Sequence, residues 1–241
     1  MAHWLDTVCR PFDHAVFAAI HRFAMAAGDF FTPLMSVITT LGDGGIAFIL
    51  LGILLLLFRR TRKLGLAVLA SIAVGAVFTN ITLKPLVARP RPFADEAHIF
   101  HTWWQEIGAH PESSFSFPSG HTTSATAAMT AIFLHCNKKY SWSALLFAPL
   151  MGFTRLYFMV HYPTDVLAGL LCGAVAAVVA YFLVRGIWYL LHRFEDRAPF
   201  RLALEFDLYV TVRRLQQRIS SRHGEKEEKK DCGCEQKEEE K

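Results

Sequence analysis

The chain has 241 residues, of which 53% are hydrophobic and 19% are charged, and its mean hydropathy is +0.29. This composition excludes an ordinary soluble domain, because such domains carry more charge and fewer apolar residues. The formal net charge is +4 at pH 7. We therefore expect an all-α protein that has a lipid bilayer as its solvent.

Residues 1–43 predict an N-terminal region of interfacial helices. Residues 12–27 mix polar and apolar side chains as an amphipathic helix in the membrane interface does. The polar ones are Asp13, His14, His21 and Arg22. Residues 29–41 predict a second short helix, which the glycine-rich turn at 42–45 ends. No signal peptide is expected, since a basic start followed by an apolar core is missing. A sixth membrane span from this region and the side of the N-terminus are left open.

Five apolar segments within residues 44–192 predict helices that cross the bilayer, two of them with the help of flanking residues. The clearest is 64–83, which would form a helix about 30 Å long at ~1.5 Å per residue. The other segments are 45–58, 124–136, 142–160 and 166–184. Together they predict a polytopic membrane helix bundle with five spans.

The basic residues predict the orientation of this bundle. Basic clusters lie at residues 59–63, at 137–139 and after 193. Cytoplasmic loops are enriched in Lys and Arg, so we expect all three clusters in the cytoplasm. The chain segments around Lys84 and His161 then lie together on the extracytoplasmic side.

The C-terminal part predicts two further regions. Residues 193–219 form a basic amphipathic pattern that is expected to lie along the inner leaflet, where each arginine near anionic lipid contributes roughly 1 kcal/mol. Residues 220–241 have mixed charge and no apolar face, which predicts disorder. The C-terminus is expected in the cytoplasm.

The five cysteines do not predict a disulfide framework. Cys9, Cys136 and Cys172 are scattered, and the last two belong to apolar segments, where packing is their expected role. Cys232 and Cys234 lie in the charged tail without further ligands nearby. No metal site is therefore predicted.

The first polar cluster is Lys84, Arg89 and Arg91, with prolines at 90 and 92. These prolines disfavour a helix, so the chain is expected to leave the membrane in an extended form. The cations would otherwise serve as interfacial residues that snorkel toward lipid headgroups. They lie, however, on the face that should be poor in basic residues, which favours a function: two or three cations directed at one anionic ligand.

The second polar cluster, Ser119, Gly120 and His121, precedes an apolar segment and predicts a helix start. Free backbone amides at a helix start bind anions, Ser119 can cap the helix, and Gly120 lets the backbone approach a ligand. His121 can donate a proton to a leaving oxygen near neutral pH. An ordinary helix cap is the alternative for Ser119.

The third polar cluster places Arg155 inside an apolar segment and His161 and Asp165 at its exit. An arginine within a span is expensive and usually functional. Pro163 is expected to break the helix, so that Asp165 returns to the imidazole of His161. Such a carboxylate fixes the tautomer and leaves the other ring nitrogen as a nucleophile. A core histidine with satisfied hydrogen bonds is the alternative.

These three clusters, from Lys84 to Asp165, resemble the motifs of the type 2 phosphatidic acid phosphatase superfamily, which also includes the vanadium haloperoxidases. The matching spacings are Lys84-(six residues)-Arg91-Pro92, Pro118-Ser119-Gly120-His121, and Arg155-(five residues)-His161-(three residues)-Asp165. One position departs from the family pattern, because Thr154 stands where the third motif usually has serine.

The resemblance implies a mechanism without metal or other cofactor. His161 would attack phosphorus to form a phosphohistidine, Asp165 would orient it, and His121 would protonate the leaving oxygen and then activate water. The groups implied to bind the phosphoryl oxygens are Lys84, Arg91, Ser119, Gly120 and Arg155. Arg89 lies outside the matched positions, so its assistance is a hypothesis.

The expected substrate is a lipid phosphate, with undecaprenyl diphosphate favoured and phosphatidylglycerophosphate or phosphatidate as alternatives. A vanadate-dependent haloperoxidase and a non-catalytic lipid-phosphate transporter or binding protein are the alternatives of other classes. We expect no nucleic-acid partner, and the oligomeric state is left open. The loop 93–117 would either cover the site or contribute Trp103 and Trp104 to an interfacial belt.

Overall fold

The structure is a computed structural model that describes residues 2–217 of the chain. Every regular element among these residues is a helix. In chain order they are α1 (Ala2–Gly42), η1 (Asp43–Gly45), α2 (Ile46–Leu56), α3 (Arg62–Ala76), η2 (Val77–Leu83), α4 (Lys84–Val87), α5 (Ile99–Glu106), α6 (Gly120–His135), α7 (Lys138–Ser141), η3 (Trp142–Leu146), α8 (Phe147–Tyr157), α9 (Pro163–Arg193) and α10 (Ala198–Glu205). Residues 208–217 are also helical.

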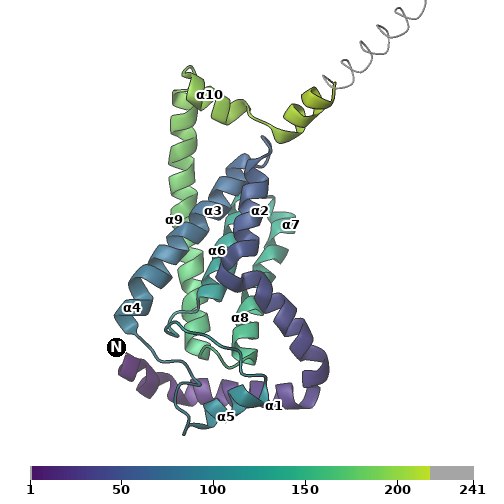
Figure 1. The fold of residues 1–241 in the computed structure, drawn as a ribbon. Coiled ribbons are helices and arrows are strands. Elements are labelled where there is room, and N and C mark those ends of the chain that lie inside the picture. The colour runs from purple at the N-terminus through teal and green to yellow at the C-terminus, as the bar shows by residue number, and fades with distance from the viewer. Residues whose placement is uncertain (1, 218–241) are drawn as a thin grey trace, which may run out of the picture.

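The N-terminal helix α1 bends at Ala27, where φ is −135°. Its first half lies across the base of the bundle, and its second half rises toward α2 (Figure 1). The predicted turn follows, with left-handed φ angles of +56° at Gly44 and +71° at Gly45, which side chains other than glycine rarely adopt. The second half of α1 therefore leads directly into α2.

A helix occupies each of the five predicted spans. In the described residues, three stretches are long and apolar enough to cross a membrane: Trp4–Leu56, Arg62–Val87 and Pro163–Arg193. The helices α6 and α8 are shorter, with 16 and 11 residues, and α6 contacts α3, α8 and α9 at the centre of the bundle. The fold is thus a helical membrane bundle, and the exact number of spans stays a prediction.

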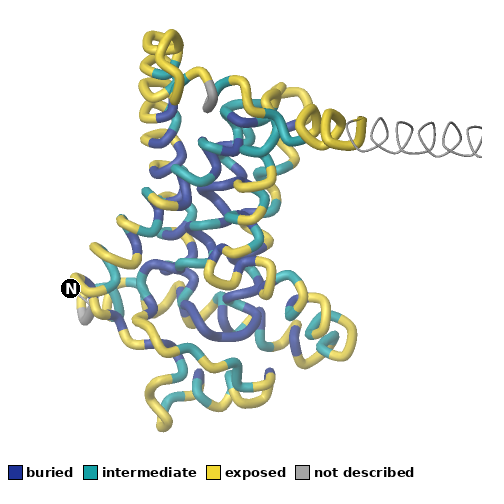
Figure 2. The backbone as a smooth tube through the Cα atoms, turned by 45° about the horizontal axis from the view of Figure 1, so that its top comes forward, coloured by how far each residue is buried: buried dark blue, intermediate teal, exposed yellow. Residues whose placement is uncertain are grey.

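The close contact of α6 with α9 depends on two glycines. A Cβ atom added to Gly173 would lie 2.5 Å from Cβ of Thr126 and 2.6 Å from the backbone oxygen of Thr123. One added to Gly169 would lie 2.8 Å from the oxygen of Ser119. Small residues allow such approach where no hydrophobic effect drives helices together. The starts of α6 and α9 are consequently held side by side, and buried positions concentrate around them (Figure 2).

At the opposite end of the bundle, α9 extends beyond the other helices and leads to α10 (Figure 1). The Arg62 guanidinium donates hydrogen bonds to the backbone oxygens of Leu204 and Phe206. The backbone N–H of Arg59 donates to the carboxylate of Asp207 at 3.0 Å. These contacts join the basic segment after α9 to the basic cluster at 59–63. The predicted disordered tail and its two cysteines lie outside the described residues.

Candidate active site

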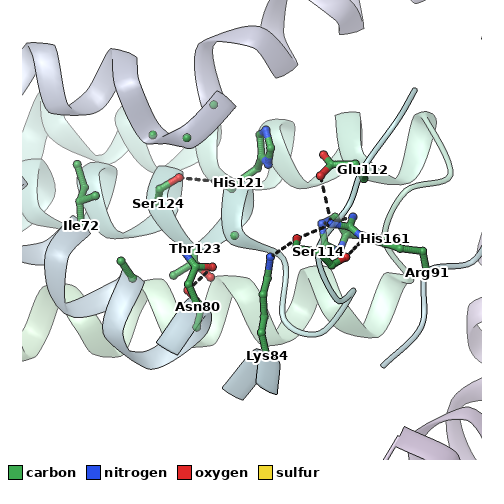
Figure 3. Close-up of a pocket in the computed structure, with 16 residues that line it drawn as sticks. Ile72, Asn80, Lys84, Arg91, Glu112, Ser114, His121, Thr123, Ser124 and His161 are labelled. Atoms are coloured by element: carbon green, nitrogen blue, oxygen red, sulfur yellow. Dashed lines mark hydrogen bonds and ion pairs between the residues drawn. The ribbon is translucent and has the colours of Figure 1, made fainter. Parts of the chain in front are cut away.

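The three polar clusters meet at a cavity of about 200 Å³ near the base of the bundle. It opens where η1, η2 and the start of α6 meet the loop that leads into α6 (Figure 3). The polar side chains that line it are Thr79, Asn80, Lys84, Arg91, Glu112, Ser114, His121, Thr123, Ser124 and His161. Residues as far apart in the sequence as Gly42 and His161 therefore face one small space.

The helix that carries Lys84 ends as the prolines predict. After α3, the chain continues through the π-helical turn η2 into α4, and Ala88 ends this helix with a φ of +52°. Residues 88–91 then have no regular secondary structure. This geometry directs Lys84 into the cavity, where its Nζ donates to Oγ of Ser114 at 3.0 Å.

Arg91 fixes the tautomer of His161. Its Nη1 lies 2.7 Å from the backbone oxygen of Val160 and 3.0 Å from Nε2 of His161. Because a guanidinium only donates hydrogen bonds, Nε2 must accept, and the ring proton of the neutral imidazole belongs on Nδ1. Nε2 is therefore the unprotonated nitrogen that could act as a nucleophile, although its lone pair accepts from Arg91 in the structure, and the side chain lines the cavity.

The contact between His161 and Asp165 differs from the expected direct hydrogen bond. Nδ1 of His161 lies 3.7 Å from Oδ2 of Asp165, which is within ion-pair range but too long for a hydrogen bond. The hydroxyl of Ser116 donates to the same Oδ2 at 2.5 Å and lies 3.5 Å from Nδ1. The helix does break between Arg155 and Asp165, but earlier than expected: α8 already ends at Tyr157, and Pro163 begins α9.

His161 is almost fully buried among cations. Burial lowers its pKa well below the usual value, and the neighbouring charges of Arg91, Arg155 and Lys84 lower it further. The imidazole is consequently neutral at pH 7, as the tautomer described above requires.

Arg89 does not line the cavity, so the three cations of the first cluster do not converge on one spot. Its guanidinium is 1% exposed and donates from Nη1 to Asp165 (2.7 Å), from Nη2 to Asp13 (2.9 Å) and from Nε to Asp6 (2.8 Å). Burial acts to lower the pKa of Arg89, but these carboxylates raise it above its usual value. Arg89 thus contacts Asp165 on the side away from the cavity and does not reach the cavity itself.

Ser119 begins α6 without capping it through its side chain. Its hydroxyl is fully buried and accepts a hydrogen bond from Oγ1 of Thr122 at 2.9 Å, and its backbone N–H donates to the backbone oxygen of Asp165 at 3.1 Å. Gly120 lines the cavity, and a Cβ atom there would lie 3.9 Å from Nζ of Lys84. The helix start and the lysine therefore face the same space.

His121 lines the same cavity as His161 (Figure 3). Burial lowers its pKa to about 2, with further lowering by the charges of Arg155, Lys84 and Arg91. Its Nε2 is 3.9 Å from Oδ1 of Asp43, an exposed carboxylate in η1. In the structure, His121 is a neutral imidazole close to several cations.

Arg155 reaches the cavity through Glu112. Its Nη1 donates to Oγ1 of Thr39 at 2.6 Å, and its Nη2 donates to Oε1 of Glu112. The Nε atom of Arg155 is buried and has no hydrogen-bond partner. The other carboxylate oxygen of Glu112 accepts from Nη2 of Arg91 at 3.2 Å. One acidic side chain therefore joins the two arginines.

The tryptophans of the loop 93–117 lie away from the cavity. The ring of Trp103 stacks on His21 of α1, with centroids 4.7 Å apart, and Trp104 stacks on Phe93 at 4.4 Å. The part of this loop that reaches the cavity contains Glu112 and Ser114. The loop thus contributes to the site, but through residues that sequence patterns did not indicate.

Comparison with known proteins agrees with this geometry. Residues 63–189 match the model of the PAP2 superfamily. The undecaprenyl-diphosphatase BcrC of Bacillus subtilis is 32% identical over 188 residues, which cover 76% of this chain and 88% of that protein.

Two solved structures share the fold. The crystal structure of Aquifex aeolicus LpxE matches with a TM-score of 0.57 and 26% identity, covering 69% of this chain and 93% of that chain. A transmembrane PAP2 type phosphatidylglycerolphosphate phosphatase from Bacillus subtilis matches with a TM-score of 0.54 and 27% identity, covering 77% and 89%.

The fold and the site thus define a membrane-embedded phosphoric ester hydrolase. The chain belongs to the PAP2 superfamily, as the spacing of its motifs predicted.

Proposed function

We propose that this protein hydrolyses a lipid phosphate or diphosphate through a phosphohistidine on His161, without a metal ion. The observation that carries the proposal is the contact of Nε2 of His161 with Nη1 of Arg91 at 3.0 Å. It identifies Nε2 as the unprotonated ring nitrogen and places it beside a cation that would bind the phosphoryl oxygens, so that a bound phosphoryl group would take over Arg91 and free the lone pair.

In the first step, Nε2 of His161 attacks phosphorus, and the bond to the leaving oxygen breaks. The positive charges of Lys84, Arg91 and Arg155 stabilise the charge of the transition state on the phosphoryl oxygens. The backbone amide of Gly120 and the helix start at Ser119 add a favourable dipole. Ser116, whose hydroxyl donates to Asp165, lies on the Nδ1 side and could accept the Nδ1 hydrogen.

His121 would protonate the leaving oxygen in this step. In the free enzyme, its pKa of about 2 leaves it unprotonated, because burial and the positive charges of the nearby lysine and arginines disfavour the charged form. A bound phosphate brings negative charge beside the ring and offsets those cations, which raises the pKa of His121. The substrate thereby helps to protonate its own general acid. In the second step, water attacks phosphorus while His121 takes its proton, the bond between phosphorus and Nε2 of His161 breaks, and phosphate is released.

The favoured substrate is undecaprenyl diphosphate. The similarity to a protein named undecaprenyl-diphosphatase supports this choice. The cavity of about 200 Å³ supports a lipid phosphate in general. This volume is below the roughly 300–1,000 Å³ of sites that enclose a small molecule, so it fits a phosphoryl headgroup whose tail stays in the bilayer. Phosphatidylglycerophosphate is the second candidate, because a solved relative is a phosphatidylglycerolphosphate phosphatase.

The proposed topology has five spans, with the cavity on the extracytoplasmic side and the C-terminus in the cytoplasm. The basic clusters at 59–63 and 137–139 and after residue 193 support this orientation. The first half of α1 would then lie in the outer interface, beside the site.

The test is phosphate release by detergent-purified protein in EDTA. Undecaprenyl diphosphate, phosphatidylglycerophosphate and phosphatidate are compared for the wild type and His161→Ala. We expect release that is insensitive to EDTA, fastest from undecaprenyl diphosphate, and lost in the variant. Release that requires added metal, or that persists in His161→Ala, would contradict the proposed mechanism, and a different ranking would change the substrate.

A further inference from the structure

Glu112 places a carboxylate inside the cavity, between two arginines that are implied to bind phosphate. Oε2 accepts from Nη2 of Arg91 at 3.2 Å, and Oε1 accepts from Nη2 of Arg155. Arg91 at the same time contacts the proposed nucleophile His161. Figure 3 shows Glu112 and His161 on the same side of the cavity. The carboxylate thus occupies donors that a phosphoryl group in reach of His161 would need.

The distribution of charge in the cavity also indicates that Glu112 occupies the position of a phosphoryl group. Among the described residues that line it, Glu112 is the one acidic side chain, and it faces Lys84 and Arg91 as well as Arg155 behind them. A carboxylate and a phosphoryl group both present anionic oxygens that guanidinium groups bind through charge-assisted hydrogen bonds. Substrate and Glu112 therefore compete for the same donors.

The backbone around Glu112 allows this exchange. Residues 109–113 have no regular secondary structure, and both Pro111 and Ser113 are exposed. The side chain of Glu112 is itself 22% exposed, so a rotation would bring its carboxylate into water. The side chains of Arg91 and Arg155 are only 5% exposed each, so they cannot turn into water in the same way.

We propose that Glu112 is a specificity-determining residue that occupies the phosphate position until a terminal phosphoryl group displaces it. This inference rests on the proposed function. A lipid phosphodiester carries one negative charge, as the carboxylate does, so replacing Glu112 with it gains no net attraction to the cations. A terminal phosphoryl group carries roughly 1.5 to 2 negative charges at pH 7 and gains attraction. Glu112 thereby selects against the phosphodiester headgroups that surround the protein in a membrane.

Substitutions of Glu112 separate this role from a structural one. Glu112→Gln removes the charge and keeps the size, and Glu112→Asp keeps the charge but is too short to reach both arginines. Glu96→Gln is the matched control, because Glu96 is an exposed acid of the same loop that does not line the cavity. If Glu112→Gln does not fold, Glu112→Asp carries the same test.

The first measurement is the affinity for orthovanadate, an analogue of phosphate, from the thermal shift of each purified protein in detergent without EDTA, which would chelate the vanadate. It requires no turnover. We expect about tenfold tighter binding in Glu112→Gln, since a competing charge-assisted contact is removed, and a smaller gain in Glu112→Asp. Glu96→Gln should match the wild type. Unchanged or weaker binding in both Glu112 variants would overturn the proposal.

The second measurement is inhibition of lipid phosphate hydrolysis by phosphatidylglycerol in mixed micelles. The Glu112 variants should be inhibited at several-fold lower phosphatidylglycerol concentration than the wild type and Glu96→Gln. Equal inhibition of all four proteins would overturn the role in specificity. A wild type that binds vanadate but hydrolyses none of the lipid phosphates would refute the proposed function, while the vanadate series would still decide the role of Glu112.

Discussion

Nη1 of Arg89 donates a hydrogen bond to Oδ1 of Asp165 at 2.7 Å, while Ser116 donates to the other carboxylate oxygen. Both oxygens of Asp165 are therefore fixed by partners other than His161. Arg89 is in turn held by Asp13, which lies on the buried face of α1. The position of the carboxylate behind the nucleophile thus depends on the N-terminal helix.

We expect Asp13→Asn to lower kcat up to about a hundredfold with little change in KM, because a displacement of ~1 Å at the nucleophile has that effect. Steady-state kinetics and orthovanadate affinity are the measurements, and vanadate should still bind normally. Asp6→Asn is the control, since Asp6 also contacts Arg89 but is 34% exposed at the rim. A kcat within twofold of the wild type in Asp13→Asn would contradict the coupling.

The glycines of α9 make a second prediction. Gly173→Ala should destabilise the protein by about 1–3 kcal/mol, the usual effect of overpacking, and should separate the starts of α6 and α9. Apparent Tm and phosphatase activity would both fall. Gly186→Ala, on the same helix, has nothing within 4 Å of the added Cβ and should behave as the wild type. Equal Tm values for the two variants would show that the α6–α9 contact is looser than described.

The buried histidine makes stability depend on pH. The folded-state pKa of His161 lies well below its usual 6.5, so below pH 6.5 the unfolded chain binds a proton that the folded protein does not. The contribution of the neutral His161 to the free energy of unfolding is therefore fully present above pH 6.5. It is lost on acidification, by up to about 1.4 kcal/mol per pH unit for one such group.

Apparent Tm between pH 7.5 and 5.0 measures this effect. His161→Gln should show a shallower decline than the wild type, whereas His192→Gln, which removes an exposed histidine, should follow the wild type. Parallel curves for all three proteins would mean that His161 is not buried as a neutral imidazole.

The proposed orientation predicts which positions react from outside. In a cysteine-free background, Ser113→Cys in the site loop should react with a membrane-impermeant maleimide in intact cells. Tyr140→Cys, at an exposed position of α7, should react only after permeabilisation. The opposite pattern would invert the topology.

Periodicity and motif spacing predicted much of this architecture. The helices follow from the apolar segments, and the break before Pro163 follows from the proline. Because polar residues collect at the ends of these segments, one cavity contains Lys84, Arg91, His121 and His161. These features depend on local sequence and on bilayer thickness, which the chain itself encodes.

Other features depend on contacts that no local pattern encodes. Asp13 was predicted on the polar face of an amphipathic helix, but it is 2% exposed because Arg89, 76 residues away, provides its partner. Ser116 and Glu112 belong to a loop segment without periodicity, so their positions beside Asp165 and Arg91 were not foreseen. Buried charges are placed where an opposite charge exists, and this pairing is a property of the fold.

The most direct test of the account is to look for the phosphohistidine. The protein is mixed with undecaprenyl diphosphate labelled with ³²P in the terminal phosphate, quenched within milliseconds in base, and separated on a denaturing gel. We predict an acid-labile, base-stable label on the wild-type protein that maps to His161 and is absent from His161→Ala. A wild type that releases labelled phosphate without ever carrying label, or a His161→Ala protein that becomes labelled, would contradict the central claim.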